Sequence, residues 1–221
     1  MVKYKILSTG SIGNCIVVND YLMLDCGLPY TKIQPYLDKI KLIFISHCHS
    51  DHLKKSTIKR IAYEKPKIKF IVGNFLVNEL IELGVNKRNV ITFETGKWFD
   101  IGIFQVKMDY LFHDVPNNCL HIKFKNEEKL FYATDTSSID HIEAKGYNLY
   151  LIEANYNTDE ELREKIKEDE EQGQFSYYKR VLETHLSQLQ AINWLDQNKN
   201  EDSEYCFIHQ HITREEEKNY E

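Results

Sequence analysis

The sequence predicts an α+β fold in which two β-sheets pack together and helices lie outside them. Two observations indicate this arrangement. Apolar runs of strand length recur in two series, and segments with helical spacing follow each series. Two packed sheets with outer helices would bury all of these runs. No Pro/Gly/Ser-rich linker interrupts the chain, so we treat residues 1–221 as a single domain.

The first series contains five strand-like runs, of which the fourth is the most informative. KLIFIS (41–46) is almost continuously apolar, as expected of a strand covered on both faces, and it ends at His47. A helix is predicted from about Ser56, and NFLVNELIELG has the pattern of an amphipathic helix with Asn74 as its cap and Gly84 as its end. The other runs are KYKILS, NCIVVN, YLMLD and IKFIV.

The second series is longer and surrounds two helical segments. A charged helix is predicted over residues 158–172. SQLQAINWLDQN is predicted to form another helix, in which Ser187 and Gln190 make a capping box. The strand-like runs of this series are VITFE, IGIFQVKM, CLHIKFK, KLFYATD, NLYLIEAN and EYCFIH.

The composition favours a packed domain without membrane segments. Hydrophobic residues make up 42% of the 221, which supports a core rather than a disordered chain. No run approaches the roughly 20 apolar residues of a membrane span. The opening MVKYKILSTG has no apolar signal segment, so a cytoplasmic location is expected. The five cysteines are scattered and odd in number, which argues against a disulfide framework.

The charge is unevenly distributed along the chain. A formal net charge of −6 excludes a molecule that binds nucleic acid over its whole surface by electrostatics alone. Residues 53–70 nevertheless carry seven basic side chains against the single acid Glu64, whereas acids crowd residues 158–172. The basic run starts directly after a histidine-rich loop. Lys54 and Lys55 are therefore candidate contacts to an anionic substrate, although two solvated faces of opposite sign would explain the same pattern.

The histidine-rich loop, SHCHSDHL (46–53), is the strongest functional signal. In an extended loop, residues two apart point the same way, so His47 and His49 can reach one ion while Cys48 faces away. Asp51 and His52 then turn toward a second position nearby. Imidazole and carboxylate are the ligands that Zn, Mn or Fe take, and a carboxylate can bridge two ions.

Further ligands are expected where other strands end. His113 follows an apolar stretch, and Asp135 lies where a strand runs into a small-residue turn. His209 and His211 both follow the last strand. His185, in THLSQ, is a weaker candidate for lining the site. His121, inside a strand, and His141, at an expected helix start, are interpreted as structural. They are therefore left out of the ligand set.

These motifs, in this order, resemble the metallo-β-lactamase superfamily. The pattern is H-x-H-x-D-H at 47–52, a later lone histidine, an aspartate after a strand and a terminal histidine. The chain is similar in particular to the small YycJ-type metallohydrolases, some of which act as nucleases. The matching segments, spread from about residue 6 to 215, are STGSIGNCIVV, LMLDCGL, HDVPN, YATDTS, LIEANY and THLS. The resemblance implies a four-layer αββα sandwich, in agreement with the order of strands and helices.

The resemblance also implies two divalent metal ions, with Zn first and Mn or Fe as alternatives. His47, His49 and His113 would hold the first ion. Asp51, His52 and a terminal histidine would hold the second, and Asp135 would bridge them. His209 directly follows the apolar strand and is favoured. His211-Ile-Thr, however, looks more like the family's His-hydrophobic-Ser/Thr ending.

Two catalytic roles follow from the same resemblance. Asp51 would act as a ligand and also orient the attacking hydroxide. His185, or whichever terminal histidine is not a ligand, would donate a proton to the leaving group. The turn at residues 10–14 is expected near the site, which makes Asn14 a candidate substrate contact, although a simple hairpin would explain this turn equally well.

Three functions are compatible with these residues. The leading hypothesis is a nuclease or phosphodiesterase acting on DNA or RNA, since two metals suit in-line displacement at phosphorus and the basic run adjoins the metal loop. The alternative is hydrolysis of a small carbonyl compound such as a lactone or thioester. The third is a metal-stabilised binding module, which would predict missing ligands. A homo-oligomer is also considered, because relatives often pair.

Overall fold

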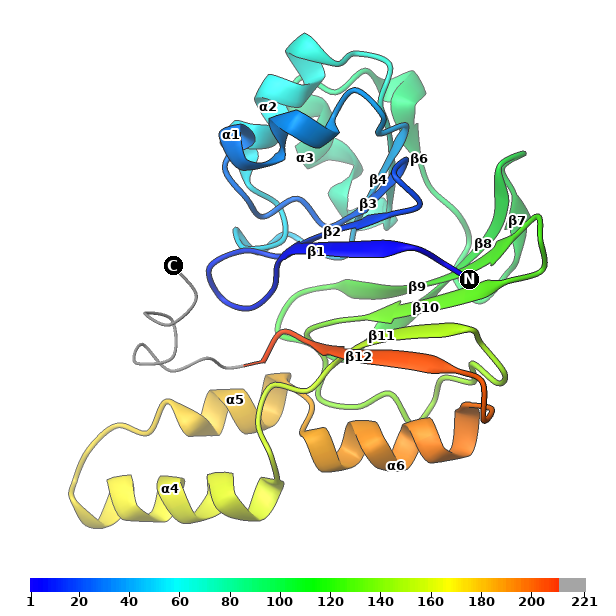
Figure 1. Cartoon of the computed structure of the whole chain (residues 1–221). Helices are drawn as coiled ribbons and strands as arrows, with labels where there is room; N and C mark the ends of the chain where they lie inside the picture. Colours follow the sequence, from blue (N-terminus) through cyan, green and yellow to red (C-terminus); the bar gives the residue numbers. More distant parts are fainter. Residues whose placement is uncertain (211–221) are drawn as a thin grey trace.

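Two β-sheets form the middle of the molecule. In residues 1–210, which the computed structural model describes, each sheet has six strands. The strand order is β1-β2-β3-β4-β5-β6 in one sheet and β12-β11-β10-β9-β8-β7 in the other. Helices α1–α3 lie outside the first sheet and α4–α6 outside the second, so the layers run helix, sheet, sheet, helix (Figure 1). The predicted α+β fold with two packed sheets is confirmed.

The first sheet and its helices use residues 4–91. Strands β1–β3 are antiparallel, and β3–β6 are parallel. The strands are β1 (Tyr4–Ser8), β2 (Cys15–Val18), β3 (Leu22–Leu24), β4 (Leu42–Ile45), β5 (Lys69–Val72) and β6 (Val90–Ile91). The helices are α1 (Tyr30–Ile33), α2 (Lys55–Glu64) and α3 (Val77–Glu82), with short 3-10 turns at Gln34–Tyr36, Asn74–Leu76 and Lys87–Asn89.

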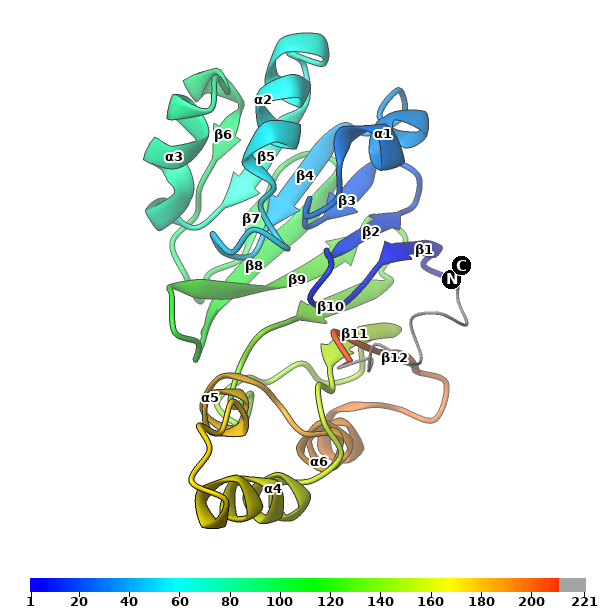
Figure 2. The same ribbon diagram turned by 90° about the vertical axis from the view of Figure 1, so that its left-hand side faces the viewer.

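The second sheet and its helices use residues 99–208. Strands β7–β10 are antiparallel, and β10, β11 and β12 are parallel. The strands are β7 (Phe99–Asp100), β8 (Phe104–Leu111), β9 (Asn117–Phe124), β10 (Lys129–Ala133), β11 (Leu149–Glu153) and β12 (Glu204–Ile208). The helices are α4 (Asp159–Glu171), α5 (Tyr178–Thr184) and α6 (Gln188–Asn198). Figure 2 shows these helices below the second sheet.

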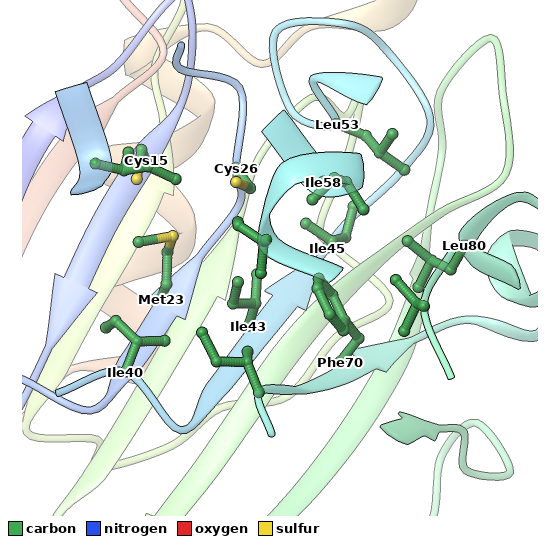
Figure 3. Packing of buried hydrophobic residues seen from close by; sticks show 14 of the residues in the cluster. Cys15, Met23, Cys26, Ile40, Ile43, Ile45, Leu53, Ile58, Phe70 and Leu80 are labelled. Atoms are coloured by element: carbon green, nitrogen blue, oxygen red, sulfur yellow. The ribbon is translucent and has the colours of Figure 1, made fainter. Parts of the chain in front are cut away.

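Strand β4 shows why the buried strands are apolar throughout. Its side chains alternate between the two faces of the sheet. Ile43 and Ile45 pack into the cluster between the first sheet and its helices, beside Phe70 of β5 (Figure 3). Leu42 and Phe44 pack into the cluster between the two sheets. Both faces are therefore covered, as the continuous apolar run predicted.

Several local predictions about helix ends are confirmed and two are wrong. Ser187 and Gln190 form the predicted capping box of α6. Gly84 ends α3 with a φ of 94°, a backbone conformation that glycine adopts at low cost. Asn74 is not a helix cap, because it begins a 3-10 turn that follows Gly73. His141 does not start a helix: it lies in a turn, where its Nε2 is 2.9 Å from the Tyr110 carbonyl oxygen.

The parallel strands bring the ends of β4, β10, β11 and β12 to one edge of the sandwich. Parallel strands end on the same side of a sheet, and loops that follow them meet there. The residues after these strands, or at their last position, are His47, Asp135, Glu153 and His209. Within residues 1–210, no helix is long and apolar enough to cross a membrane.

Candidate metal centre

The loop after β4 brings three histidines together with a fourth from the second sheet. The backbone turns sharply, since the carbonyl oxygen of His49 accepts hydrogen bonds from the N–H groups of His52 and Leu53. The Nδ1 atom of His49 lies 3.1 Å from Nε2 of His47 and 3.3 Å from Nε2 of His113. The Cys48 side chain points away from these rings, as predicted, and packs against the hydrophobic cluster between the first sheet and its helices.

Asp135 lies between two groups of candidate ligands. Its Oδ2 is 3.6 Å from Nε2 of His47 and 3.7 Å from Nε2 of His113. Its Oδ1 is 3.3 Å from Nε2 of His52 and 3.1 Å from Nδ1 of His209. Each carboxylate oxygen therefore faces a different group, which is the arrangement that a bridging ligand requires.

The ligand atoms of each group are close enough to share one ion. Those of His47, His49, His113 and Asp135 all lie within 4.8 Å of one another. Asp135 also belongs to a second group, whose ligand atoms lie within the same distance of one another. The other members of this group are Asp51, His52 and His209. Imidazole nitrogens with carboxylate oxygens are a donor set that divalent transition metals take. The residues present therefore fit divalent metal ions.

Burial and charge set the ionisation of these groups. Burial lowers the pKa of His47 well below its ordinary value, and burial also lowers the pKa of His113. Both rings are thus neutral near pH 7 and offer a lone pair. Burial alone would raise the pKa of the Asp135 carboxyl, but the charges of His209 and His52 hold it well below its usual range. The negative carboxylate is therefore available as a ligand.

The buried carboxylate of Asp25, which follows β3, holds the histidine loop from behind. Its Oδ2 is 2.6 Å from Nδ1 of His52 and accepts hydrogen bonds from the hydroxyls of Ser46 and Tyr132, at 2.9 and 2.6 Å. Its Oδ1 accepts from the backbone N–H of Ser46. The Ser46 hydroxyl in turn lies 3.0 Å from Nδ1 of His47. These contacts fix both rings with Nε2 toward the ligand groups.

A second buried carboxylate, Glu153 at the end of β11, holds His185. Its Oε1 is 2.6 Å from Nδ1 of His185, and its Oε2 accepts from the backbone N–H of Thr136 and of Leu186. Burial would lower the pKa of His185, but the Glu153 carboxylate raises it above its ordinary value. With Nδ1 bound to Glu153, Nε2 is the ring nitrogen left for other contacts. The structure thus brings His185 to the site.

The turn at residues 10–14 supports the loop from another direction. Asn14 is buried, and its Nδ2 is 2.8 Å from Nε2 of His52 and 3.3 Å from the carbonyl oxygen of Asp51. Its backbone N–H donates to the same Asp51 oxygen. Gly27 approaches so closely that an added Cβ would lie 1.7 Å from this oxygen. The contacts of Asn14 therefore position the ligand loop, whereas its predicted contact with substrate stays a prediction.

A polar cavity of about 160 Å³ opens onto the ligand groups. Arg180 lies at this cavity and donates to Oδ2 of Asp114 at 2.7 Å. The other residues that line the cavity come from the turn, the ligand loop, the strand ends and the two ends of α5. They are Ser11, His49, Asp51, His113, Asp135, Asn155, Tyr177, His185, His209 and Gln210.

The two predicted substrate lysines lie away from this lining. Lys55 begins α2 and pairs with Glu79 at 2.9 Å, and Lys54 precedes it. Within residues 1–210, neither lysine is part of the cavity lining. His211, the alternative last ligand, lies outside the described residues. His121 is held by Asp109, which lies 2.9 Å from it and also binds Lys107.

Sequence reasoning missed the roles of Asp25 and Glu153. Both are acidic residues at or just after the end of an apolar strand, in LMLD and LYLIE. A carboxylate placed there must be paired if it is buried, which is the signal that would have marked them as supports for nearby histidines. Tyr177 at the cavity carried no comparable signal in the sequence, and Asn155 was noted only as part of the matching segment LIEANY.

Comparisons with known proteins agree with this fold. The model of the beta-lactamase superfamily domain matches residues 22–210, and the chain therefore belongs to that family. The metallo-beta-lactamase fold protein YhfI from Bacillus subtilis superposes with a TM-score of 0.71 at 17% identity, covering 99% of this chain and 92% of that one. Human tRNase Z, short form, superposes with a TM-score of 0.67 at 17% identity, covering 95% and 92%.

Curated relatives match only part of this chain. The cytidine monophosphate-N-acetylneuraminic acid hydroxylase of Sus scrofa is 31% identical over 100 residues, which are 42% of this chain and 23% of that protein. The enzyme of the same name from Asterias rubens is 34% identical over 95 residues, 40% of this chain and 14% of that protein. This chain thus spans less than a quarter of the length of these relatives. The likeness to the YycJ-type group stays a prediction.

Replacing Asp25 by Asn tests the support behind the histidine loop. Asp25→Asn removes the carboxylate that holds His52 and Ser46, so we expect metal affinity to fall by about 10–100-fold. A competition titration with a chromogenic zinc chelator measures the change. Asp38→Asn is the matched control, because the Asp38 side chain is 84% exposed and pairs with Lys65 on the surface. A folded Asp25→Asn protein with wild-type metal affinity would contradict this role.

Proposed function

We propose that this protein is a binuclear metal-dependent phosphodiesterase that cleaves nucleic acid. One observation carries the proposal: the two oxygens of the buried Asp135 face separate ligand groups beside a cavity that also contains Arg180. His47, His49 and His113 would hold one ion, and the other would be held by Asp51, His52 and His209. Zn suits this donor set best, and Mn or Fe would also be accepted.

Divalent cations bound there would make water acidic enough to attack near neutral pH and would stabilise the charge that develops on the phosphate. The chain itself supplies the groups that orient the reactants. Burial would raise the pKa of Asp51, but contact with His52 lowers it, so the carboxylate is ionised and can accept a hydrogen bond from the attacking water. Its Oδ2, 3.3 Å from Nε2 of His52, lies at the edge of the second ligand group.

His185 would give a proton to the leaving group. Its Nδ1 is engaged by Glu153, and its ring lies beside the rings of His113 and His209, with centroids 5.6 and 5.3 Å away. The Nε2 atom is therefore the one available in the cavity. A histidine so held in one orientation can act as general acid when the phosphodiester bond breaks.

Arg180 is suited to bind the phosphate. Its side chain is 60% exposed, and Asp114 holds one of its guanidinium nitrogens while others remain available to a ligand. Guanidinium groups bind phosphate oxygens through paired hydrogen bonds. Lys54 and Lys55 directly follow the ligand loop and would contact only a substrate that extends beyond the cavity.

A nucleic-acid substrate is supported by this anion-binding group and by the shared fold with a protein named as a tRNase. The small size of the cavity, about 160 Å³, favours a second candidate: hydrolysis of a small carbonyl compound such as a lactone or thioester at the same centre. A cytoplasmic location, a single domain over residues 1–221 and a homo-oligomeric state stay predictions from the sequence.

Cleavage of labelled polymers tests the proposed function. Metal-loaded protein is incubated with end-labelled single-stranded DNA, duplex DNA and RNA in Mn or Zn. We expect metal-dependent cleavage that Asp51→Ala reduces by about 100-fold or more, because the group that orients water is lost. Asp38→Ala, at a carboxylate that is 84% exposed and pairs with Lys65, should keep full activity. A metal-loaded wild type that cleaves none of the polymers would refute the proposal, and small esters, thioesters and lactones would be tried next.

The role of His185 is tested by changing the leaving group. His185→Gln should lower kcat by about 10²–10⁴-fold for a dinucleotide, whose alkoxide leaving group needs a proton. The same variant should lose much less activity on a 4-nitrophenyl phosphodiester, because 4-nitrophenolate leaves without protonation. Glu153→Gln, which removes the carboxylate that holds His185, should also lower activity more on the dinucleotide than on the 4-nitrophenyl phosphodiester. Equal losses on both substrates would show that His185 acts in some way other than as general acid.

A further inference from the structure

A second cavity adjoins the metal centre on the side of α4 and α5. Its volume is about 310 Å³, and its walls come from residues 155–165 and 177–181. Asn155 and Tyr177 line both this cavity and the smaller one at the ligands. One molecule can therefore occupy both, with its reacting group at the metal centre and a neighbouring part between the two helices. Figure 1 shows α4 and α5 side by side, below and beside the second sheet.

Aromatic side chains form much of the larger cavity. Tyr156, Tyr177 and Tyr178 all line it. The Tyr156 hydroxyl donates to Asp159, which holds that ring in place, and Lys165 lies 5.3 Å from the centre of the Tyr178 ring. Tyr177 is 53% exposed, so its ring is available to a ligand. Exposed aromatic faces are surfaces on which nucleobases stack.

Polar groups in the same cavity can hydrogen-bond to a base or sugar. Asn155 is tied to the metal centre, because its Nδ2 donates to the carbonyl oxygen of His209 at 2.9 Å. Asn157 and Thr158 continue the lining away from the ligands. Amide and hydroxyl groups beside stacking rings are the combination that reads unpaired bases in single strands.

The charge of α4 decides which part of a substrate fits here. Its first turn carries Asp159, Glu160 and Glu161, and Glu161 lines the cavity. Lys165 is the other charged residue of the lining, so the two formal charges balance and the cavity suits an uncharged group better than a phosphate. The phosphate would therefore lie on the side of Arg180, and the base and sugar would lie between the helices.

We propose that this α4–α5 cavity binds the nucleoside next to the scissile phosphate of a single-stranded substrate. The inference rests on the proposed phosphodiesterase function and specifies its substrate. A cavity of this size is at the small end of ligand-binding pockets and accommodates one nucleoside rather than a duplex. A base that is paired and stacked in a duplex would have to leave its stack to enter, which costs free energy that a single strand does not require.

Two small phosphodiesters test the inference in the metal-loaded full chain. One is thymidine 5′-(4-nitrophenyl phosphate), and the other is methyl 4-nitrophenyl phosphate, which has the same leaving group and no nucleoside. We expect the wild type to prefer the thymidine ester by roughly tenfold or more in kcat/KM, as stacking of one base allows. Tyr177→Ala and Tyr178→Ala should reduce this preference severalfold, and Tyr177→Phe, which keeps the ring, should retain it.

The matched control is Tyr63→Ala, since Tyr63 is 86% exposed on α2, outside the first sheet. It should leave the preference unchanged. Hydrolysis of both esters without preference in the wild type, or a preference that Tyr177→Ala and Tyr178→Ala both retain, would overturn the nucleoside site and leave the phosphodiesterase proposal intact.

The phosphodiesterase proposal can also fail while the nucleoside site remains, and this case can be distinguished. If the metal-loaded wild type hydrolyses neither ester, the phosphodiesterase proposal fails. Equilibrium dialysis with thymidine then tests the cavity by itself. Binding that Tyr177→Ala weakens and Tyr63→Ala retains would support a nucleoside site, whereas no binding to the wild type would overturn it.

Discussion

The Asp135 carboxylate is almost fully buried, and the surrounding structure is arranged to compensate its charge. A buried carboxylate without partners is costly, because its hydration is lost and nothing replaces it. Here Oδ1 accepts a hydrogen bond from the Thr134 hydroxyl at 2.7 Å, and imidazole rings approach both oxygens. Those imidazoles come from loops of both sheets. Candidate ligands from both sheets therefore meet at this one side chain.

The backbone around the site is held in an uncommon conformation. Six non-glycine residues in residues 1–210 have positive φ, and three of them, Asp25, Asp135 and His209, belong to the site, with φ of 57°, 53° and 51°. L-residues adopt this conformation at a cost, and such strain persists where surrounding contacts over-determine it. In each case a strand end turns abruptly and directs a polar side chain toward its neighbours. The strands thus hold these residues in place, and the turns that follow the strands set the direction of their side chains.

Much of the fold, and the gathering of the candidate ligands at one place, could be predicted from local patterns. A continuous apolar run identified β4 because both faces of that strand are buried, and a period of two placed His47 and His49 on one side. Asp135 and His209 were predicted from their places after strands. The two residues do lie together, because parallel strands end at a common edge of a sheet and the loops that follow them meet there. Their binding of metal stays a prediction.

Other features depend on partners far away in the chain, which local patterns do not reveal. Nothing near Asp25 indicates Tyr132, 107 residues away, whose hydroxyl binds its carboxylate. Lys55 pairs with Glu79 from another helix, which its sequence neighbours do not indicate, and its contact with substrate stays a prediction. Asn74 follows the residue preferences of a cap, yet the chain makes a 3-10 turn there before α3 starts. Helix α5 was missed because seven residues carry too little periodicity to stand out.

The proposed mechanism depends on Asp135 being shared by two metal sites. Metal content per chain, measured by mass spectrometry after equilibration with zinc and removal of unbound ions, is the test of this sharing. We expect two ions per chain in the wild type and less than one in Asp135→Ala, because both groups lose the same ligand. Asp140→Ala, at an exposed carboxylate nearby in sequence, should keep both. A wild type with at most one ion, or an Asp135→Ala protein that retains two, would show that Asp135 does not bridge two metal ions.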